Sequence, residues 1–341
     1  MKMKRNLIAV AAAGLASAVI VTPAMADATA YGLVQVEVAS YSNQTEAAGC
    51  NDQSTASGEG GCDGIALVDR SNGRVGVKAS EDLGNGWTGL AKAEFQIDTA
   101  NGGWATSPTN AAREMFVGLK GSGVEIQLGN LKSAYKYTGG VKYDPFVATT
   151  LEARRDNGGM WHTSYGQGGF LPQNIGVMGG SGPIKFWLTY SPSEGFHDMT
   201  ASVMYTQDAF EVFVAMSDQG DKSATADSAT KVGGAFKTGP HKIKLQYEMV
   251  DRDLTPSRDE TYMFLGYELK MGQNTVVAQL GQYDGDGLLG VGGKKVDTSY
   301  MAIGVIHNFT KMTRLFAGYR TSDADDETDE DVISVGLRKD F

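Results

Sequence analysis

Residues 242–249 read Lys-Ile-Lys-Leu-Gln-Tyr-Glu-Met, a strict alternation of polar and apolar side chains. Because successive side chains of a β-strand point to opposite faces, this stretch predicts a strand with one charged face and one apolar face. The same alternation recurs in residues 34–38, 87–98, 314–320 and 333–341. The chain is therefore predicted to be all-β, with strands whose two faces differ.

The connections between the strands form two sets that alternate along the chain. The short ones are residues 81–86, 121–123, 207–209, 238–241 and 270–274, and the long polar ones are residues 42–69, 99–112, 130–173, 218–230, 284–297 and 321–331. Short turns at one rim and long loops at the other are typical of an outer-membrane β-barrel. The prolines after residue 26, at positions 108, 145, 172, 183, 192, 240 and 256, all lie in proposed turns or loops, as fully paired strands require.

Sixteen strands are predicted by this pattern. They are placed at residues 29–41, 70–80, 87–98, 113–120, 124–129, 174–179, 184–190, 200–206, 210–217, 231–238, 242–250, 260–269, 275–283, 298–307, 313–320 and 332–341. A barrel of this size has a lumen too wide for side chains to fill, so a water channel follows. Since Lys or Arg on the lipid face costs about 2–4 kcal/mol at mid-membrane, the charged face is expected to point inward. We predict one transmembrane antiparallel β-barrel domain over residues 27–341.

Composition excludes nucleic-acid binding and disfavours a soluble α/β enzyme. The 341 residues carry 30 Lys and Arg against 40 Asp and Glu, a formal charge of −10, and no basic block. Such a chain lacks the electrostatic footprint that nucleic acid requires. The 45 glycines, together with 14 Tyr, 13 Phe and 4 Trp, favour strands and turns over helices.

Residues 1–26 have the features of a cleaved signal peptide. Lys2, Lys4 and Arg5 form a basic start, residues 7–21 are apolar and uncharged, and Ala24-Met25-Ala26 is a small-x-small site. A membrane anchor is the alternative, but an apolar run of 15 residues is shorter than the roughly 20 of a membrane helix. We expect an exported mature chain that begins at residue 27, with 27 basic and 40 acidic residues, a formal −13.

Both cysteines, Cys50 and Cys62, lie in a segment rich in Gly, Ser, Asn, Asp and Thr, which predicts an exposed loop. In an oxidising compartment two such thiols are expected to form a disulfide, which stabilises by about 3 kcal/mol through loop closure. A metal-binding or redox pair is the alternative. Their spacing disfavours it, because it matches neither a CxxC motif nor a tetrahedral zinc site.

No motif selects a catalytic or metal site. The histidines at positions 162, 197, 241 and 307 are scattered, and the Asp-Gly-Asp-Gly of residues 284–287 lacks the distal Glu of a calcium-binding EF-hand loop. Seven acidic residues lie between positions 323 and 331, where a hydrated outer loop is favoured over cation bridging to lipopolysaccharide. We therefore expect no catalytic residues, no metal and no cofactor.

Three stretches of the sequence carry a resemblance to a known family. Residues 74–96 contain Arg-Val-Gly-Val-Lys, Glu-Asp-Leu-Gly-Asn-Gly and Lys-Ala-Glu-Phe-Gln; residues 113–121 read Arg-Glu-Met-Phe-Val-Gly-Leu-Lys-Gly before Gln-Leu-Gly at 127–129; and the last strand ends in Phe341. The chain resembles the general porins of Gram-negative outer membranes, which are trimeric sixteen-stranded diffusion channels. This resemblance implies a homotrimer in contact with lipid and lipopolysaccharide. It also implies that the outer-membrane assembly machinery recognises the strand ending in Phe341.

The resemblance further implies that the loop at about residues 130–160 folds into the barrel and narrows it, with acidic residues facing basic ones on the wall. Arg74 matches the family's wall arginine on the second strand, and Lys92 matches its lysine on the third. Asn130 stands where the family usually has arginine, and Asp144 and Glu152 are nearest to its missing acidic motif. The predicted constriction residues are Arg74, Lys78, Lys92 and Glu94 on the wall and Lys132, Lys136, Lys142, Asp144, Glu152, Arg154, Arg155 and Asp156 on the loop.

The expected function is passive diffusion of ions and small hydrophilic solutes, without enzymatic activity. Eight basic against four acidic constriction residues predict a weak anion preference, although the acidic chain as a whole suggests a preference for cations. Two alternatives stay open, a solute-selective channel and a barrel that acts through its outer loops as an adhesin or enzyme. Single-channel conductance in a planar bilayer distinguishes a diffusion channel, which is open, from a closed barrel that acts through its outer loops.

Overall fold

The structure is a computed structural model of the chain, and it describes residues 27–42, 64–70, 73–103, 112–154, 159–160, 170–192, 199–218, 228–252, 258–289, 295–324 and 329–341. The proposed signal peptide, Cys50, Cys62, Arg155 and Asp156 lie outside the described residues. Among the residues that are described, no helix is long and apolar enough to cross a membrane.

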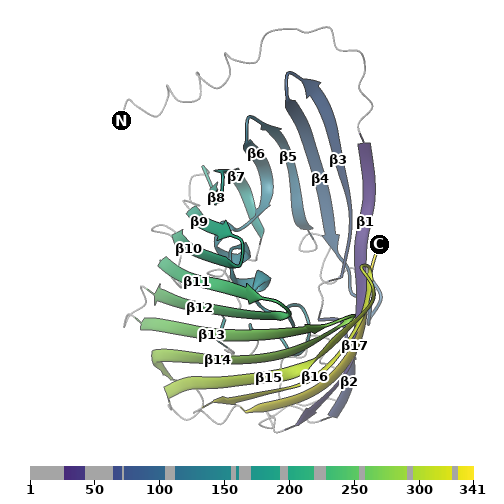
Figure 1. Ribbon diagram of the computed structural model, residues 1–341, viewed down its shortest axis with the longest axis vertical. Helices are drawn as coiled ribbons and strands as arrows, with labels where there is room; N and C mark the ends of the chain where they lie inside the picture. The colour runs from purple at the N-terminus through teal and green to yellow at the C-terminus, as the bar shows by residue number, and fades with distance from the viewer. Residues whose placement is uncertain are drawn as a thin grey trace.

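Antiparallel strands make up almost all of the described chain (Figure 1). In chain order the elements are β1 (Asp27–Ser42), β2 (Gly64–Val68), β3 (Arg74–Gly84), β4 (Trp87–Gln96), β5 (Ala112–Gly121), β6 (Val124–Lys132), α2 (Ala134–Tyr137), η1 (Gly140–Lys142), β7 (Phe170–Ser181), β8 (Ile184–Tyr190), β9 (Met199–Gln207), β10 (Phe210–Asp218), β11 (Ser228–Thr238), β12 (His241–Arg252), β13 (Arg258–Met271), β14 (Asn274–Leu289), β15 (Lys295–Thr310), β16 (Thr313–Ala324) and β17 (Glu330–Asp340).

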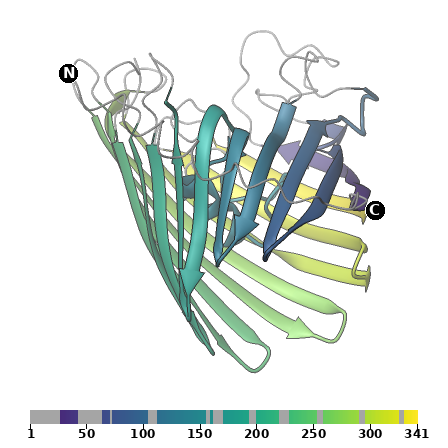
Figure 2. The same cartoon turned by 90° about the horizontal axis from the view of Figure 1, so that it is seen from above.

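The sheet closes on itself because its first and last strands pair. In β1, residues 33–42 pair with residues 331–340 of β17, while its other edge pairs with both β2 and β3. β2 and β3 are thus two pieces of one strand position, and the barrel has sixteen positions. Figure 2 shows the strands inclined around the wall, with green hairpin ends meeting at one rim. The predicted antiparallel sixteen-stranded barrel is confirmed.

The structure corrects three details of the predicted strands. The strand expected at 70–80 is interrupted, and the Asp69 carboxylate accepts a hydrogen bond from the Thr99 amide (2.7 Å) at the break. Strands extend into the proposed loop at residues 284–297 from both sides, because β14 continues to Leu289 and β15 begins at Lys295. Pro172 lies inside β7, not in a loop, and a register shift between Gly129 and Leu131 of β6 leaves it without a pairing partner there.

The two faces of the wall reverse the burial pattern of a soluble protein. In β12, Leu245 points outward and is 53% exposed, whereas the neighbouring Lys244 points inward and is 3% exposed. The inward side chains are covered because the chain between β6 and β7 enters the barrel. Its Tyr143, Phe146 and Leu151 form an apolar core against inward residues of β10 and β13–β16, namely Phe213, Phe264, Val277, Tyr300, Ala302, Ile306 and Phe316. The main hydrophobic core therefore lies inside the barrel.

Candidate functional site: the lumen and its inner loop

The chain between β6 and β7 forms a loop inside the ring of strands, as Figure 1 shows for its helical turns. We call its described residues, 133–154 and 159–160, the inner loop. Ser133 caps α2, because its hydroxyl accepts a hydrogen bond from the Lys136 amide (3.3 Å). The loop expected at about 130–160 thus occupies the lumen.

Polar contacts with β9 and β12 hold the first half of the inner loop. The Ala134 amide donates to the Thr200 hydroxyl (2.9 Å), and the Tyr135 hydroxyl donates to Glu248 (2.9 Å). The Lys231 ammonium lies 4.3 Å from the centre of the Tyr135 ring. Because Lys231 is only 1% exposed, this cation anchors the loop and does not contact passing solute.

Two adjacent glycines let the loop lie directly on the wall. Gly139 and Gly140 have φ values of 61° and 45°, a conformation that other residues rarely adopt. A Cβ at Gly139 would overlap the Phe213 ring of β10, and the Gly140 amide donates to the Gln246 side chain of β12. Close approach and positive φ together require glycine at Gly139.

Asp144, predicted to face the constriction, instead organises the second half of the loop. Its two oxygens accept hydrogen bonds from the amides of Phe146 (2.8 Å) and Ala153 (2.7 Å) and from the Gln279 side chain (2.6 Å). It is 2% exposed, and burial together with the nearby Glu152 raises its pKa to about 6. The Asp144 carboxylate therefore stabilises the fold of the inner loop and does not face the water of the lumen.

Glu152 is also buried. It accepts a hydrogen bond from the Ala148 amide (2.7 Å) and pairs with Arg154, whose pKa it raises. A third buried carboxylate, Glu37 of β1, accepts bonds from the amide (2.9 Å) and hydroxyl (2.8 Å) of Thr150. The structure therefore places both acidic loop candidates that it describes away from the water of the lumen.

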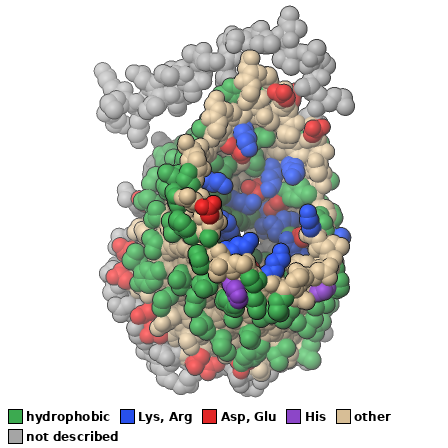
Figure 3. Space-filling view, viewed as in Figure 1, with side chains coloured by type: hydrophobic (Ala, Val, Ile, Leu, Met, Phe, Trp, Pro, Cys, Tyr) green, Lys and Arg blue, Asp and Glu red, His purple; other side chains and the backbone are tan. Residues whose placement is uncertain are grey.

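A cluster of charged side chains lies on β3–β6. Its members, which we call the basic wall cluster, are Arg74, Lys92, Arg113 and Lys132 with Glu94 and Glu114. The Arg113 Nε lies 2.6 Å from Glu94, and the Lys132 Nζ lies 2.8 Å from Glu114. Four cations against two carboxylates leave the cluster with a formal charge of +2. Figure 3 shows Lys and Arg side chains gathered in the hollow of the barrel.

A β-bulge explains why the sequence did not indicate Arg113. Pairing of β4 with β5 shifts between Ala93 and Phe95, where Arg113 and Glu114 lie opposite the single residue Glu94. Both side chains therefore contact inward-facing groups, although alternation would place one of them on the outer face. The available signal in the sequence was the adjacent pair Arg113 and Glu114, because a charged side chain of a membrane strand is costly when it faces lipid.

The other predicted loop and wall cations lie in different surroundings. Lys78 is exposed in the lumen, 5.8 Å from the centre of the Tyr31 ring. Lys142 pairs with Glu211 of β10 (3.0 Å). Lys136 is half-buried, and burial together with Arg154 lowers its pKa to about 7.

Further inward cations that the sequence did not single out lie on β12, β16 and β17. Lys244 pairs with Glu268, Arg320 with Glu330, and Arg338 with Asp340 (2.7 Å). Among the described residues, no group of three His, Cys, Asp or Glu is placed to hold a metal ion. The geometry provides charge and narrowing inside the barrel.

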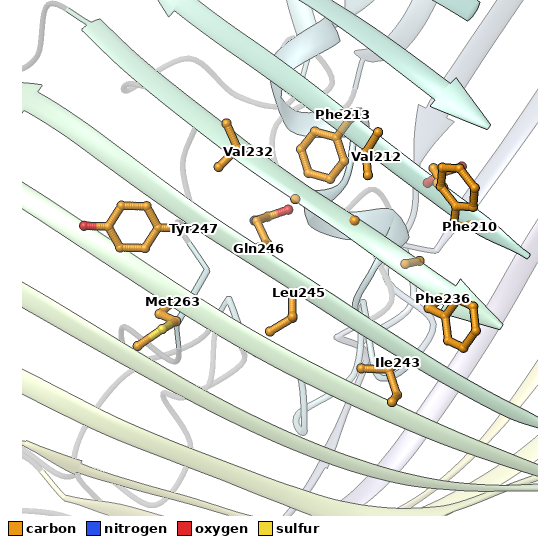
Figure 4. A pocket seen from close by; sticks show the side chains of 14 residues that line it. Phe210, Val212, Phe213, Val232, Phe236, Ile243, Leu245, Gln246, Tyr247 and Met263 are labelled. Atoms are coloured by element: carbon orange, nitrogen blue, oxygen red, sulfur yellow. The ribbon is translucent and has the colours of Figure 1, made fainter. Parts of the chain in front are cut away.

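A groove of about 650 Å³ lies on the outer wall over β10–β13 (Figure 4). It opens at Gly234, where the absence of a side chain leaves space between outward residues such as Val212, Phe236 and Leu245. Its lining is mainly apolar and it lies on the outside of the barrel. It is therefore separate from the charged lumen.

Comparison with known proteins places the chain in a family. Residues 7–327 match the family model described as Gram-negative porin. The major outer membrane protein P.IB of Neisseria lactamica is 25% identical over 361 residues, which cover 90% of this chain and all of that protein. P.IB of Neisseria meningitidis serogroup B is 33% identical over 141 residues, and this match spans only 37% of that protein and 41% of this chain.

Solved structures share the fold at low identity. An anion-selective porin from Comamonas acidovorans superposes with a TM-score of 0.73 at 17% identity, covering 93% of this chain and all of that one. A trimer form of OmpT from Vibrio cholerae gives 0.64 at 14% identity, covering 93% of this chain and 99% of that one. Together with the closed barrel and its inner loop, these matches show that the chain belongs to the Gram-negative porins of the outer membrane.

Proposed function

We propose that the protein forms a water-filled channel for passive diffusion of ions and small hydrophilic solutes, with a preference for anions. The observation that carries the preference is the charge of the basic wall cluster, where four cations meet two carboxylates. Asp144 and Glu152, the acids that would offset it, are 2% and 0% exposed. Charges at a narrow section act at close range, whereas acids in outer loops are screened beyond about 8 Å.

Passive diffusion needs no covalent chemistry. Two observations support the proposed channel and its preference for anions. A sixteen-position barrel encloses more space than side chains fill, so water enters around the inner loop. The structural relative from Comamonas acidovorans is named an anion-selective porin, which agrees with the proposed preference.

We also propose a homotrimer, as in the trimer form of OmpT. In the middle of β3 and β4 the outward side chains are short, with Val75, Val77, Ala79, Ala91 and Ala93, and the larger Trp87 and Phe95 lie toward the two ends of β4. By contrast, exposed aromatic residues gather on β8–β12, among them Phe186, Tyr190, Phe210, Phe236 and Tyr247. Aromatic residues are typical of a surface that meets the membrane interface, so the small-residue face is the better candidate for contact between subunits.

Reversal potentials in a salt gradient test the selectivity. The double variant Arg74→Gln/Lys92→Gln removes two cations of the cluster and should shift the reversal potential toward cation selectivity. The matched control is Lys237→Gln/Lys311→Gln, because both lysines are exposed and lie at the short-turn rim, outside the cluster. We expect the control to keep the wild-type value. A strongly cation-selective wild type at high salt, unchanged by the first double variant, would contradict the proposal, and a barrel that does not conduct would reject the channel itself.

A further inference from the structure

A second pocket, of about 520 Å³, lies between the inner loop and the tips of the β5–β6 and β7–β8 hairpins. We call it the rim pocket. Its walls include Tyr137 and Lys142 of the inner loop and inward residues of β7–β9. Short turns mark the periplasmic rim of such barrels, so a solute that has passed the inner loop meets this pocket next. The volume is in the range of small-molecule sites.

We infer that the rim pocket binds small aromatic monocarboxylates, a class of solute for the channel proposed above. Its apolar floor is set by strand register, because Met178 lies opposite Trp187 and Met204 lies opposite Lys185. Tyr137 adds a second ring to the lining. Two thioethers and two aromatic rings make favourable contacts with a flat ring, through offset or edge stacking and sulfur–aromatic contact.

The charge of the lining selects an anion. Lys120, Lys142 and Lys185 line the pocket together with one carboxylate, Glu125, and after the pairing of Lys142 with Glu211 a formal +1 remains. Glu125 is already engaged, by Lys120 at 3.8 Å and by the Gln127 amide at 2.7 Å. An anionic solute therefore meets an excess of positive charge.

A single carboxylate suits the pocket because one ammonium group is available. Lys142 is held by the two Glu211 oxygens, at 3.0 and 3.2 Å. Among the described residues no carboxylate lies within ion-pair distance of Lys185. The Lys185 Cγ would lie 3.3 Å from a Cβ at Gly180, so the absence of a side chain there gives the Lys185 stem room to lie across β7. One free cation beside an apolar floor matches a carboxylate attached to a ring.

Binding of benzoate to the folded barrel tests this inference. Ligand-detected saturation-transfer NMR should show benzoate bound, with acetate, which has no ring, and benzyl alcohol, which has no charge, at least tenfold weaker. Lys185→Gln should weaken benzoate about tenfold, as loss of a charge-assisted hydrogen bond does. Lys237→Gln removes an exposed lysine at the same rim, outside the rim pocket, and should leave binding unchanged. Trp187→Leu should weaken binding severalfold, and Trp187→Phe, which keeps a ring, should restore most of it.

Equal binding by wild type and Lys185→Gln would overturn the inference, and so would acetate that binds as well as benzoate. Circular dichroism of each variant confirms that the barrel has folded before binding is compared. Conductance separates this test from that of the proposed function. An open channel that binds no benzoate would reject the rim pocket alone, whereas a closed barrel that binds it would reject the channel and leave the pocket standing.

Discussion

Single residues show how far side-chain chemistry depends on distant partners. Asp144 and Glu152 are predicted as constriction acids because they lie nearest to the family's missing acidic motif, yet both accept hydrogen bonds from the loop's own amides. Gln279, which also donates to Asp144, is 135 positions away in the chain. No local pattern reports such a contact. The sequence therefore indicates many of the charges in the lumen region, although not Arg113, and it does not indicate which of them face water.

Burial of Asp144 predicts a measurable pH dependence of stability. Its pKa of about 6 lies above the unfolded value of 3.8, so the folded state holds the proton more tightly. This contribution to the free energy of unfolding is present below pH 4 and is lost as the pH rises through 6, by up to about 3 kcal/mol. Unfolding in guanidinium at pH 3.5 and 7 should show this loss in the wild type but not in Asp144→Asn. Parallel changes in the two proteins would contradict the assignment.

Secondary-structure elements were the most predictable level of this fold. Each of the sixteen predicted strands has a counterpart, because alternation along a two-faced strand is local and repeats at every other residue. The errors lie at the bulge opposite Glu94, at the shift near Leu131 and at the break after Val68. At each of these places an extra residue or a gap changes which face of the sheet the following side chains point to. The inner loop has no such period, and its path depends on contacts with strands far along the chain.

Gly139→Ala tests whether contact with the wall positions the inner loop. A Cβ there meets both positive φ and the Phe213 ring, so the loop should leave the wall and change the size of the lumen. We expect altered single-channel conductance and larger current noise with unchanged strand content. Gly272→Ala is the matched control, since Gly272 has φ 62° in a hairpin turn and open space around it. It should carry only the backbone strain, about 1–2 kcal/mol, and conduct as the wild type does. The same conductance in both variants would refute a positioning role.

The whole molecule is held closed at the seam between its first and last strands. The Phe341 amide donates to the Gly32 carbonyl (3.0 Å), and the Gly32 amide donates to the Phe341 carbonyl (2.9 Å). The Phe341 ring lies over Gly32 on the outer face, in the space that a side chain there would fill. The last residue therefore completes the ladder that closes the barrel.

Deletion of Phe341 should lower the amount of folded barrel in the outer membrane, because it removes the last pair of ladder bonds and the ring over Gly32. Heat-modifiable mobility on gels measures the folded fraction. Phe341→Ala isolates the ring, with Phe309→Ala as its control, since the two rings are 53% and 51% exposed. We expect the control to assemble normally. Normal assembly of the deletion, with only a changed conductance, would assign Phe341 to the pore and not to assembly.

The seam between β1 and β17 also forms late, because its two strands lie far apart in the sequence. Ser334 of β17 donates to Glu37 of β1, a partner 297 positions earlier, so all of the intervening chain must be synthesised before this bond can form. Until then the nascent sheet keeps two unpaired edges, and each is a template for pairing with another chain. Contacts of such long range also slow folding, because the chain loses conformational entropy on closing the loop before the new contacts stabilise the fold. Closing the seam therefore also removes the two edges at which an unfinished sheet could pair with another chain.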